Sequence, residues 1–143
     1  MFGVTGQRKE TTMAKYEIIE DLLYTNEHEW IRKIGDDIVE IGISAYAAGE
    51  LGDLVYAEAE PEDTELSEGD IIGSVESVKM ASDVFSPVNG TIVEANEDIE
   101  DEPESINESP YETWIVKVKL DDASELDELM DAAEYEKFLD EEA

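Results

Sequence analysis

Short segments in which apolar and polar residues alternate, separated by turn residues, fill most of this chain. A period of two places the apolar side chains on one face of a β-strand, and many short strands favour a small sandwich or a flattened barrel. HEWIRKI, the turn Gly35-Asp36-Asp37 and IVEIGIS together predict a β-hairpin. We expect further strands over DLVYAEAE, DIIGSVES, MASDVFS and WIVKVKL, a tight turn at Asn89-Gly90 and a loop over 97–110. The alternation therefore restricts the chain to a mainly β fold.

Two segments depart from this period. SAYAAGEL predicts a short helix near 44–51, because small helix formers follow a serine. In SELDELMDAAEYEKFL the apolar residues recur at helical spacing, so we expect one amphipathic helix over 124–139, with Ser124 as its N-cap and Asp127 in its first turn. The 143 residues suffice for one domain, which we place over 16–143 behind a flexible tail over 1–15. Met1 and Met13 are both candidate start residues.

The charge of the chain limits its partners. Nine Lys and Arg stand against forty Asp and Glu, a formal net charge of −31. Such a field repels phosphate and anionic lipid, so we expect no nucleic-acid or membrane partner. Because no long apolar run is present, we expect a cytoplasmic protein. We interpret the acidic composition as a surface adapted to high salt, since at about 1 M salt the screening length is only ~3 Å.

The residue types exclude most catalytic chemistry. The chain has no cysteine, which rules out disulfides, thiolate nucleophiles and cysteine-bound metals. Forty carboxylates single out no catalytic pair, and His28, the one histidine, lies beside Trp30 at the start of a strand, where a structural or surface role is expected. The acidic stretch 97–104 lacks the order of ligands that a calcium loop needs. We therefore expect neither a catalytic residue nor a metal site.

Lys79 stands apart from this acidic background. It is the only basic residue between Ile34 and Val116, and it lies between two predicted strands in GSVESVKMASD. A lysine at the tip of a hairpin is usually only a solvated charge. A rigid hairpin that presents one ε-amine is, however, also what a modifying enzyme needs, because the loop is already ordered. An acylated lysine loses its charge and gains a long arm, which suits a carrier of reacting groups.

The segment GSVESVKMASDVFSPVNGTIVEANE resembles the lipoyl-attachment segment of the H proteins of the glycine cleavage system. The resemblance includes YTNEHEW, IGISAYA and LGDLVYAEAEP upstream, and INESPYETWIVKVKL and SELDELMDAAEYEKFL downstream, over about residues 16–139. The combination of ESVK, SP-x-x-G and HEW is specific, although no single piece is. The resemblance implies a lipoyl-domain-like hybrid of two antiparallel sheets, with Lys79 at an exposed hairpin turn.

The resemblance also implies a function. Lys79 would carry (R)-lipoate, so that a chain without cysteine takes part in dithiol chemistry as a non-catalytic shuttle. Glycine decarboxylase, a pyridoxal-phosphate enzyme, would load the arm with an aminomethyl group. The aminomethyltransferase would pass the carbon to tetrahydrofolate, dihydrolipoamide dehydrogenase would reoxidise the dithiol, and a lipoate-attaching enzyme would install the group. We expect the carrier to be a monomer.

Further site residues follow from the same resemblance. Glu76, three residues before Lys79, matches the glutamate that lipoate-attaching enzymes read, and Gly90 matches the glycine that follows in the family's motif. Glu29 and Asp83 match acidic positions that line a cleft for the loaded arm, where a carboxylate pairs with the amine of the arm. Incidental placement is the alternative for these two carboxylates in so acidic a chain.

The chain departs from the family pattern at three places. The segment 110–114, PYETW, is one residue short and lacks a glycine; Met80 replaces the alanine that often follows the lysine; and Glu50 stands where some members carry a cleft histidine. Met80 supplies half of the Met-Lys-Met setting of biotin carriers, but Val78 precedes the lysine. A biotin carrier, a lipoyl domain of a 2-oxo acid dehydrogenase, and an acidic scaffold with an unmodified Lys79 are the alternative functions.

Overall fold

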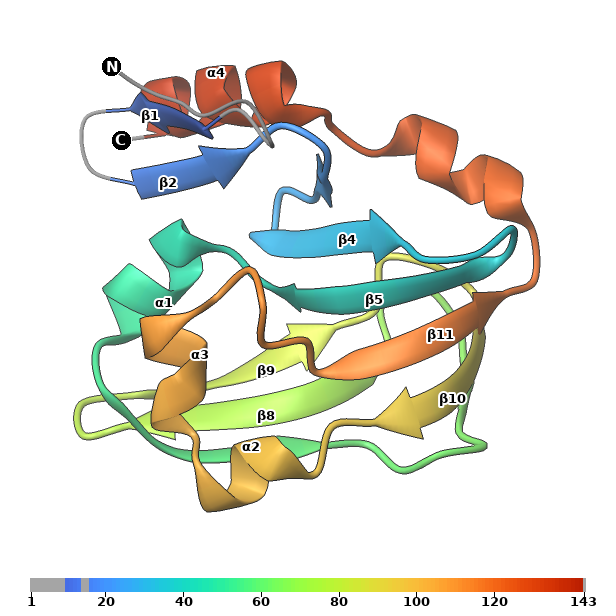
Figure 1. Ribbon diagram of the computed structural model, residues 1–143, viewed down its shortest axis with the longest axis horizontal. Helices are drawn as coiled ribbons and strands as arrows, with labels where there is room; N and C mark the ends of the chain where they lie inside the picture. The colour runs from blue at the N-terminus through green and yellow to red at the C-terminus, as the bar shows by residue number, and fades with distance from the viewer. Residues whose placement is uncertain (1–9, 14–15, 143) are drawn as a thin grey trace.

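The computed structural model describes residues 10–13 and 16–142, and its strands form three antiparallel sheets (Figure 1). The six-stranded sheet consists, in spatial order, of β3 (Leu23–Tyr24), β4 (Glu29–Lys33), β5 (Ile38–Ile43), β11 (Val116–Leu120), β10 (Gly90–Ala95) and β7 (Glu65–Leu66). The three-stranded sheet consists of β6 (Leu54–Ala59), β8 (Ile71–Ser77) and β9 (Ala81–Phe85), and the two-stranded sheet of β1 (Glu10–Met13) and β2 (Tyr16–Ile19). The prediction of a mainly β fold with two antiparallel sheets is confirmed, and these sheets stay open rather than closing into a barrel.

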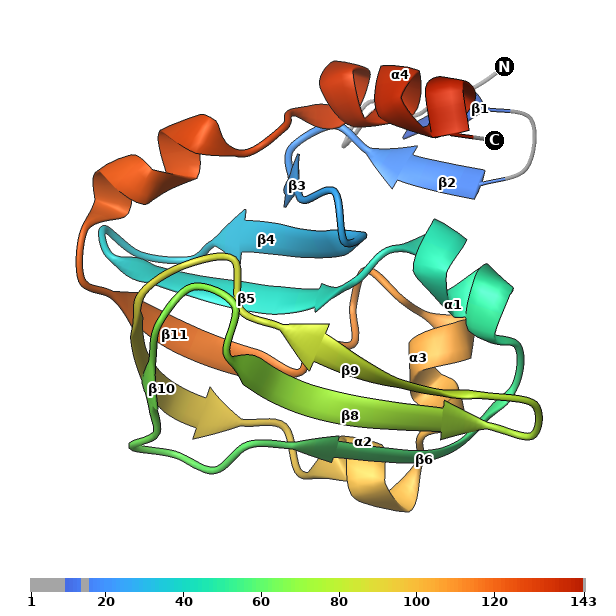
Figure 2. The same cartoon turned by 180° about the vertical axis from the view of Figure 1, so that it is seen from behind.

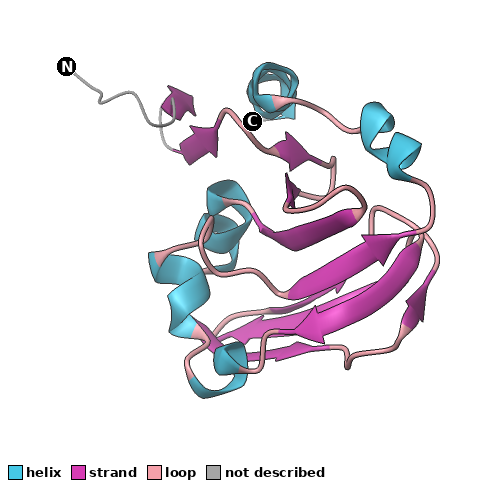
Figure 3. Ribbon diagram, turned by 45° about the vertical axis from the view of Figure 1, so that its right-hand side comes forward, coloured by secondary structure: helices cyan, strands magenta, loops and turns pink. Residues whose placement is uncertain are grey.

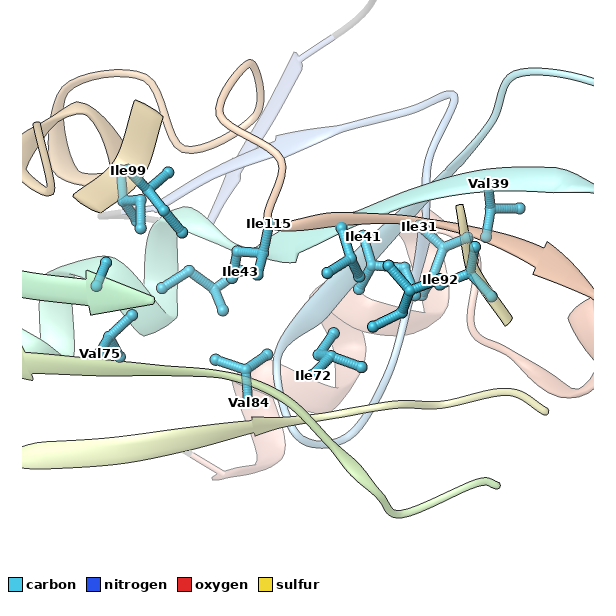
Figure 4. Packing of buried hydrophobic residues seen from close by; sticks show 14 of the residues in the cluster. Ile31, Val39, Ile41, Ile43, Ile72, Val75, Val84, Ile92, Ile99 and Ile115 are labelled. Atoms are coloured by element: carbon cyan, nitrogen blue, oxygen red, sulfur yellow. The ribbon is translucent and has the colours of Figure 1, made fainter. Parts of the chain in front are cut away.

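The main core lies between the six-stranded and the three-stranded sheet. Side chains of β8 and β9, among them Ile72 and Val84, face Ile41 and Ile43 of β5 across the interior (Figure 4). All four are at most 4% exposed, so the apolar face of each sheet is buried by the other. The predicted hairpin is present, with Glu29 of β4 opposite Ile43 of β5.

In the described residues, four α-helices and one 3₁₀ helix lie at the margins of the sheets (Figure 3). The predicted helix near 44–51 is α1 (Ala45–Leu51), and the Ser44 side chain caps it by accepting a hydrogen bond from the Ala47 amide. The segment 97–110, predicted as a loop, instead contains α2 (Asp98–Asp101) and α3 (Glu104–Glu108). Ile99 and Ile106 are fully buried and fasten these helices to the core, a long-range contact that the acidic composition of the segment conceals.

The single helix predicted over 124–139 is wrong. The structure has a 3₁₀ helix, η1 (Ala123–Glu128), and a separate helix, α4 (Ala132–Glu142). Met130 lies between them and exchanges two backbone hydrogen bonds with Tyr24 of β3, so the chain is extended at this point. Ser124 is not the N-cap either, because the Asp122 side chain caps η1 by accepting from the Ser124 amide. The apolar residues do recur at helical spacing, but the backbone pairing of Met130 with Tyr24 divides the segment into two helices.

The structure differs from two further expectations and describes only part of the segment concerned in a third. Gly90 opens β10 instead of making a tight turn with Asn89, and it has no positive φ. The strand β6 does not alternate strictly, because a bulge at Val55 leaves both Val55 and Tyr56 exposed. Within the predicted tail over 1–15, residues 10–13 form β1 and pair with β2, whereas 1–9 and 14–15 lie outside the described residues. No helix in the described part of the chain is long and apolar enough to cross a membrane.

Candidate functional site

Lys79 lies in the turn that joins β8 to β9, at one end of the three-stranded sheet (Figures 1 and 2). The turn is closed by a hydrogen bond of 2.7 Å from the Ser77 amide to the Met80 carbonyl. The buried Ser77 hydroxyl oxygen also accepts from the amides of Lys79 and Met80, at 3.2 and 3.1 Å. One serine therefore orders the backbone on both sides of the lysine.

The Lys79 side chain is exposed and passes over the backbone of Gly52. An added Cβ at Gly52 would lie 3.4 Å from the lysine Cε and 3.9 Å from its Nζ. Gly52 has φ of +84°, a conformation that strongly favours glycine. The Asn107 amide donates to the Gly52 carbonyl at 2.9 Å and accepts from the Leu54 amide at 2.9 Å, which holds this segment in place. Among the described residues, no carboxylate forms an ion pair with Lys79.

Glu76, which the resemblance predicts to be recognised by lipoate-attaching enzymes, is exposed on β8 close to the turn. It lies opposite Tyr56 of β6 and Ala81 of β9, so its side chain is on the outer face of the three-stranded sheet. An enzyme that approaches Lys79 from outside would meet this carboxylate at the same time.

A groove of about 840 Å³ opens at the other end of β9. Its apolar wall is formed by residues at and after the end of β9 and by residues of the C-terminal segment: Phe85, Pro87, Leu129, Met130 and Phe138. Its acidic groups are Glu27, Glu29, Glu68, Glu125 and Glu128. The groove therefore combines the two properties that an aliphatic chain with a cationic end requires.

Glu29 is the most buried carboxylate of this groove, with 3% of its surface exposed. One oxygen accepts from the Thr25 hydroxyl at 2.7 Å, and the other accepts from the Phe85 amide at 3.3 Å. Burial raises the pKa of Glu29 to about 7, although these two hydrogen bonds oppose the shift; the charge of Glu27 adds to it. Glu29 thus changes charge near neutral pH.

The other predicted cleft residues do not line the groove. Asp83 is exposed on the outer face of β9, where its carboxylate accepts from the Ser74 hydroxyl at 3.2 Å. Phe85, two residues further on, lies on the same face, so Asp83 lies between Lys79 and the groove. Glu50 is exposed near the end of α1, on the side where Gly52 meets Lys79.

Gly90 lies far from the Lys79 turn, within the six-stranded sheet (Figure 1). It is buried, and a Cβ at this position would overlap the Lys119 carbonyl oxygen and lie 2.8 Å from a Val118 methyl. Only a glycine allows β10 to approach β11 so closely. Gly90 therefore allows the close pairing of β10 with β11, away from the Lys79 turn.

His28 packs within an aromatic cluster. Its Nδ1 is 2.9 Å from the Tyr135 hydroxyl, and its ring contacts those of Tyr46, Tyr135 and Phe138. The Tyr135 hydroxyl lies 2.8 Å from the Ser44 hydroxyl, which links α4 to the start of α1. These contacts place His28 in the packing between α1 and α4, and the sequence predicts a structural or surface role for it.

Several residues of the Lys79 turn and of the groove were not predicted from the sequence. Ser77, Gly52 and Asn107 support the lysine, but they come from three separate elements and show no common pattern in the chain. The groove residues Leu129 and Met130 carried a signal, their apolar character, which was assigned to the packing of a helix. No group of three or more His, Cys, Asp or Glu in the described residues is arranged to hold a metal ion.

Comparison with known proteins agrees with this geometry. The family model described as "Glycine cleavage H-protein" matches residues 22–142. A glycine cleavage system H protein of Staphylococcus haemolyticus is 52% identical over 122 residues, which cover 85% of this chain and 96% of that protein. The H protein of Thermoanaerobacter pseudethanolicus is 51% identical over 126 residues, 88% of this chain and 99% of that one. The crystal structure of a glycine cleavage system H protein from Mycobacterium marinum has a TM-score of 0.76 and 35% identity, and the match covers 85% of this chain and 98% of that one. The chain belongs to the glycine cleavage H-protein family.

Proposed function

We propose that Lys79 is the residue to which this H protein attaches its lipoyl group. As a member of its family the chain is a non-catalytic, lipoyl-carrying shuttle of the glycine cleavage system. The assignment to Lys79 rests on one observation above all: its ε-amine is exposed on an ordered turn and no carboxylate among the described residues pairs with it. When attached, the lipoyl group supplies a dithiolane that accepts and releases the aminomethyl group.

The protein contributes the presentation of the amine. The two amides held by Ser77 fix the backbone at the lysine, so an attaching enzyme does not have to order the loop itself. Gly52 supports the side-chain stem without obstructing its end. Glu76, exposed nearby, supplies the charge that the attaching enzyme reads.

We further propose that Glu29 and Asp83 receive the amine of the loaded arm. Four steps of β9 separate Ala81 from Phe85, about 13 Å at the rise of a strand, so an arm on Lys79 can lie along this outer face toward the groove. Asp83 lies beside it, and Glu29 lies where the apolar wall begins. A carboxylate at the groove would bind the ammonium end, while the apolar wall would cover the chain and exclude water. Glu50, near Gly52, would instead contact the base of the arm.

The enzymes proposed to use the carrier are glycine decarboxylase, the aminomethyltransferase, dihydrolipoamide dehydrogenase and a lipoate-attaching enzyme. A single arm has to visit each of these in turn. An exposed lysine at the end of a rigid sheet is compatible with that succession.

The test is intact-mass spectrometry of the native protein, followed by the exchange of bicarbonate with the glycine carboxyl group in the presence of glycine decarboxylase. We expect one lipoyl mass on the peptide that contains Lys79. Lys79→Arg should keep the fold and abolish exchange, whereas Lys137→Arg, at another exposed lysine, should leave both unchanged. A biotinyl mass, or exchange at the wild-type rate in Lys79→Arg, would contradict the proposal.

A further inference from the structure

Exposed apolar side chains gather around the Lys79 turn. In the described part of the chain, seven large hydrophobic residues are at least 40% exposed, and four of them lie at this end of the three-stranded sheet. The four, which we call the tip patch, are Val55 (58%), Tyr56 (40%), Val78 (81%) and Met80 (47%). On a surface otherwise dominated by carboxylates, such a concentration marks a site of interaction.

A β-bulge creates half of this patch. Leu54 pairs with Ser77 and Tyr56 pairs with Glu76, so that Val55 is an extra residue between the two pairs. Without the bulge, one of two successive side chains would face the core. With it, Val55 and Tyr56 are both exposed, on the strand next to the one that leads into the lysine turn. Bulges are frequent beside functional sites because they redirect side chains in this way.

Carboxylates border the patch on its outer side. The Tyr56 hydroxyl donates to Glu58 at 2.7 Å. This hydrogen bond raises the pKa of Tyr56, and the nearby charges of Glu58, Glu100 and Glu76 raise it further, which places three acidic groups around one ring. Lys79 is the only basic residue between Ile34 and Val116, and acylation removes its charge. The acylated tip is therefore apolar at its centre and negative at its rim.

We propose that the tip patch is the docking surface for the decarboxylase that loads the arm, and that this enzyme meets it with an apolar depression ringed by Lys and Arg side chains. This inference rests on the function proposed above. The decarboxylase acts only on the acylated carrier, whose tip no longer holds an ammonium group that would have to lose its water. The acidic rim requires a basic counterpart, which also argues against a second copy of this chain as the occupant.

The apolar centre is tested with a double variant, Val55→Thr together with Tyr56→Thr. Threonine suits a strand and, at position 55, keeps the β-branched shape of valine, while it reduces the apolar surface at both positions. The matched control is Val93→Thr, because Val93 is also the extra residue of a bulge, in β10, and is 40% exposed. With fully lipoylated preparations, we expect the KM of the decarboxylase for the carrier to rise about tenfold in the double variant at unchanged kcat, and to stay the same in the control. Equal KM values in all three proteins would overturn the proposal.

The basic ring is tested with Glu58→Lys against Glu62→Lys, an exposed glutamate in the loop after β6. A reversed charge at the rim should raise the KM about tenfold, and the same change in the loop should raise it much less. Equal effects would show that only the net charge matters and would remove the basic ring from the proposal.

The outcomes separate this inference from the function on which it depends. If Lys79 carries no lipoyl mass, the proposed function fails. If Lys79 is lipoylated and exchange proceeds while the tip variants behave as the wild type, only the docking surface fails. Sedimentation of the wild-type protein as a dimer that the double variant dissociates would identify a second copy as the occupant, and would also overturn the proposal.

Discussion

The buried carboxylate of Glu29 should make the stability of this protein depend on pH in a way that one substitution removes. Its pKa rises from an ordinary value of 4.5 to about 7, mainly because it is buried. At about 1.4 kcal/mol per pH unit, the shift corresponds to about 3 kcal/mol. Since the native state holds this proton to a higher pH than the unfolded chain does, the contribution to stability is present below pH 4.5 and is lost as the pH rises through about 7.

Glu29→Gln replaces the carboxylate with a side chain of the same shape that stays neutral, like the protonated acid. The free energy of unfolding of the variant, relative to the wild type, should increase by about 3 kcal/mol in total, mostly between about pH 4.5 and 7. The other carboxylates titrate in both proteins, so they cancel in this difference. Urea denaturation at constant high salt, followed through the fluorescence of the buried Trp30, measures it.

Glu112→Gln is the control for the loss of one carboxylate, because this glutamate is exposed. A difference between Glu29→Gln and the wild type that does not change with pH would refute the assigned burial and its cost. The same reasoning gives a functional result: the ammonium end of a loaded arm would favour the ionised carboxylate, so aminomethyl loading should stabilise the wild type above pH 7 and not the variant.

Three other predictions concern the fold and the tip. Gly90→Ala should lower the free energy of unfolding, measured by heat or urea, by about 3 kcal/mol, because the added Cβ would overlap the Lys119 carbonyl. Gly35→Ala is the control, because a Cβ at that position makes only ordinary contacts. Equal stabilities of the two variants would exclude the overlap. Ser77→Ala removes two hydrogen bonds of the turn, so it should lower the free energy of unfolding by about 1 kcal/mol and slow lipoylation in a mass-spectrometric time course. Ser124→Ala should leave the rate of lipoylation unchanged. An unaltered rate in Ser77→Ala would mean that the turn is ordered without this serine. Transfer from about 1 M to 0.05 M salt should lower the melting temperature, followed by far-UV circular dichroism. At low salt the net charge of −31 is screened less, so the carboxylates repel one another over a longer distance. A constant melting temperature would contradict adaptation to salt.

The features predicted correctly from the sequence depend on local patterns. The hairpin of β4 and β5, the helix α1 with its Ser44 cap, and the strands on both sides of Lys79 follow from alternation, turn residues and capping within short segments. The errors arise where distant contacts override a local preference. The predicted C-terminal helix breaks because Met130 pairs with Tyr24, and the predicted loop over 97–110 contains helices because Ile99 and Ile106 reach the core.

In the candidate site, too, the residues that are close in sequence were predictable and those brought together by folding were not. Lys79, Glu76 and Asp83 lie in one hairpin, so a single continuous motif contains them. The groove draws on β4, the end of β9 and the segment between η1 and α4, and only the folded chain brings Leu129 and Met130 to Glu29. Sequence therefore finds the proposed point of attachment, whereas the groove that we propose for the arm is seen only in the structure.

One strand connects Lys79, the proposed attachment point, to this groove. β9 starts just after Lys79 and ends at Phe85, whose amide is hydrogen-bonded to Glu29. Its length thus sets both the place where the amine is presented and the distance that an attached arm has to span. An insertion in β9 would move the tip away from the groove by ~3.3 Å per residue and turn Asp83 to the opposite face. The short spacing between Lys79 and Asp83 is therefore a geometric requirement of the proposed arrangement, in which the arm is exposed at its base and sheltered at its end.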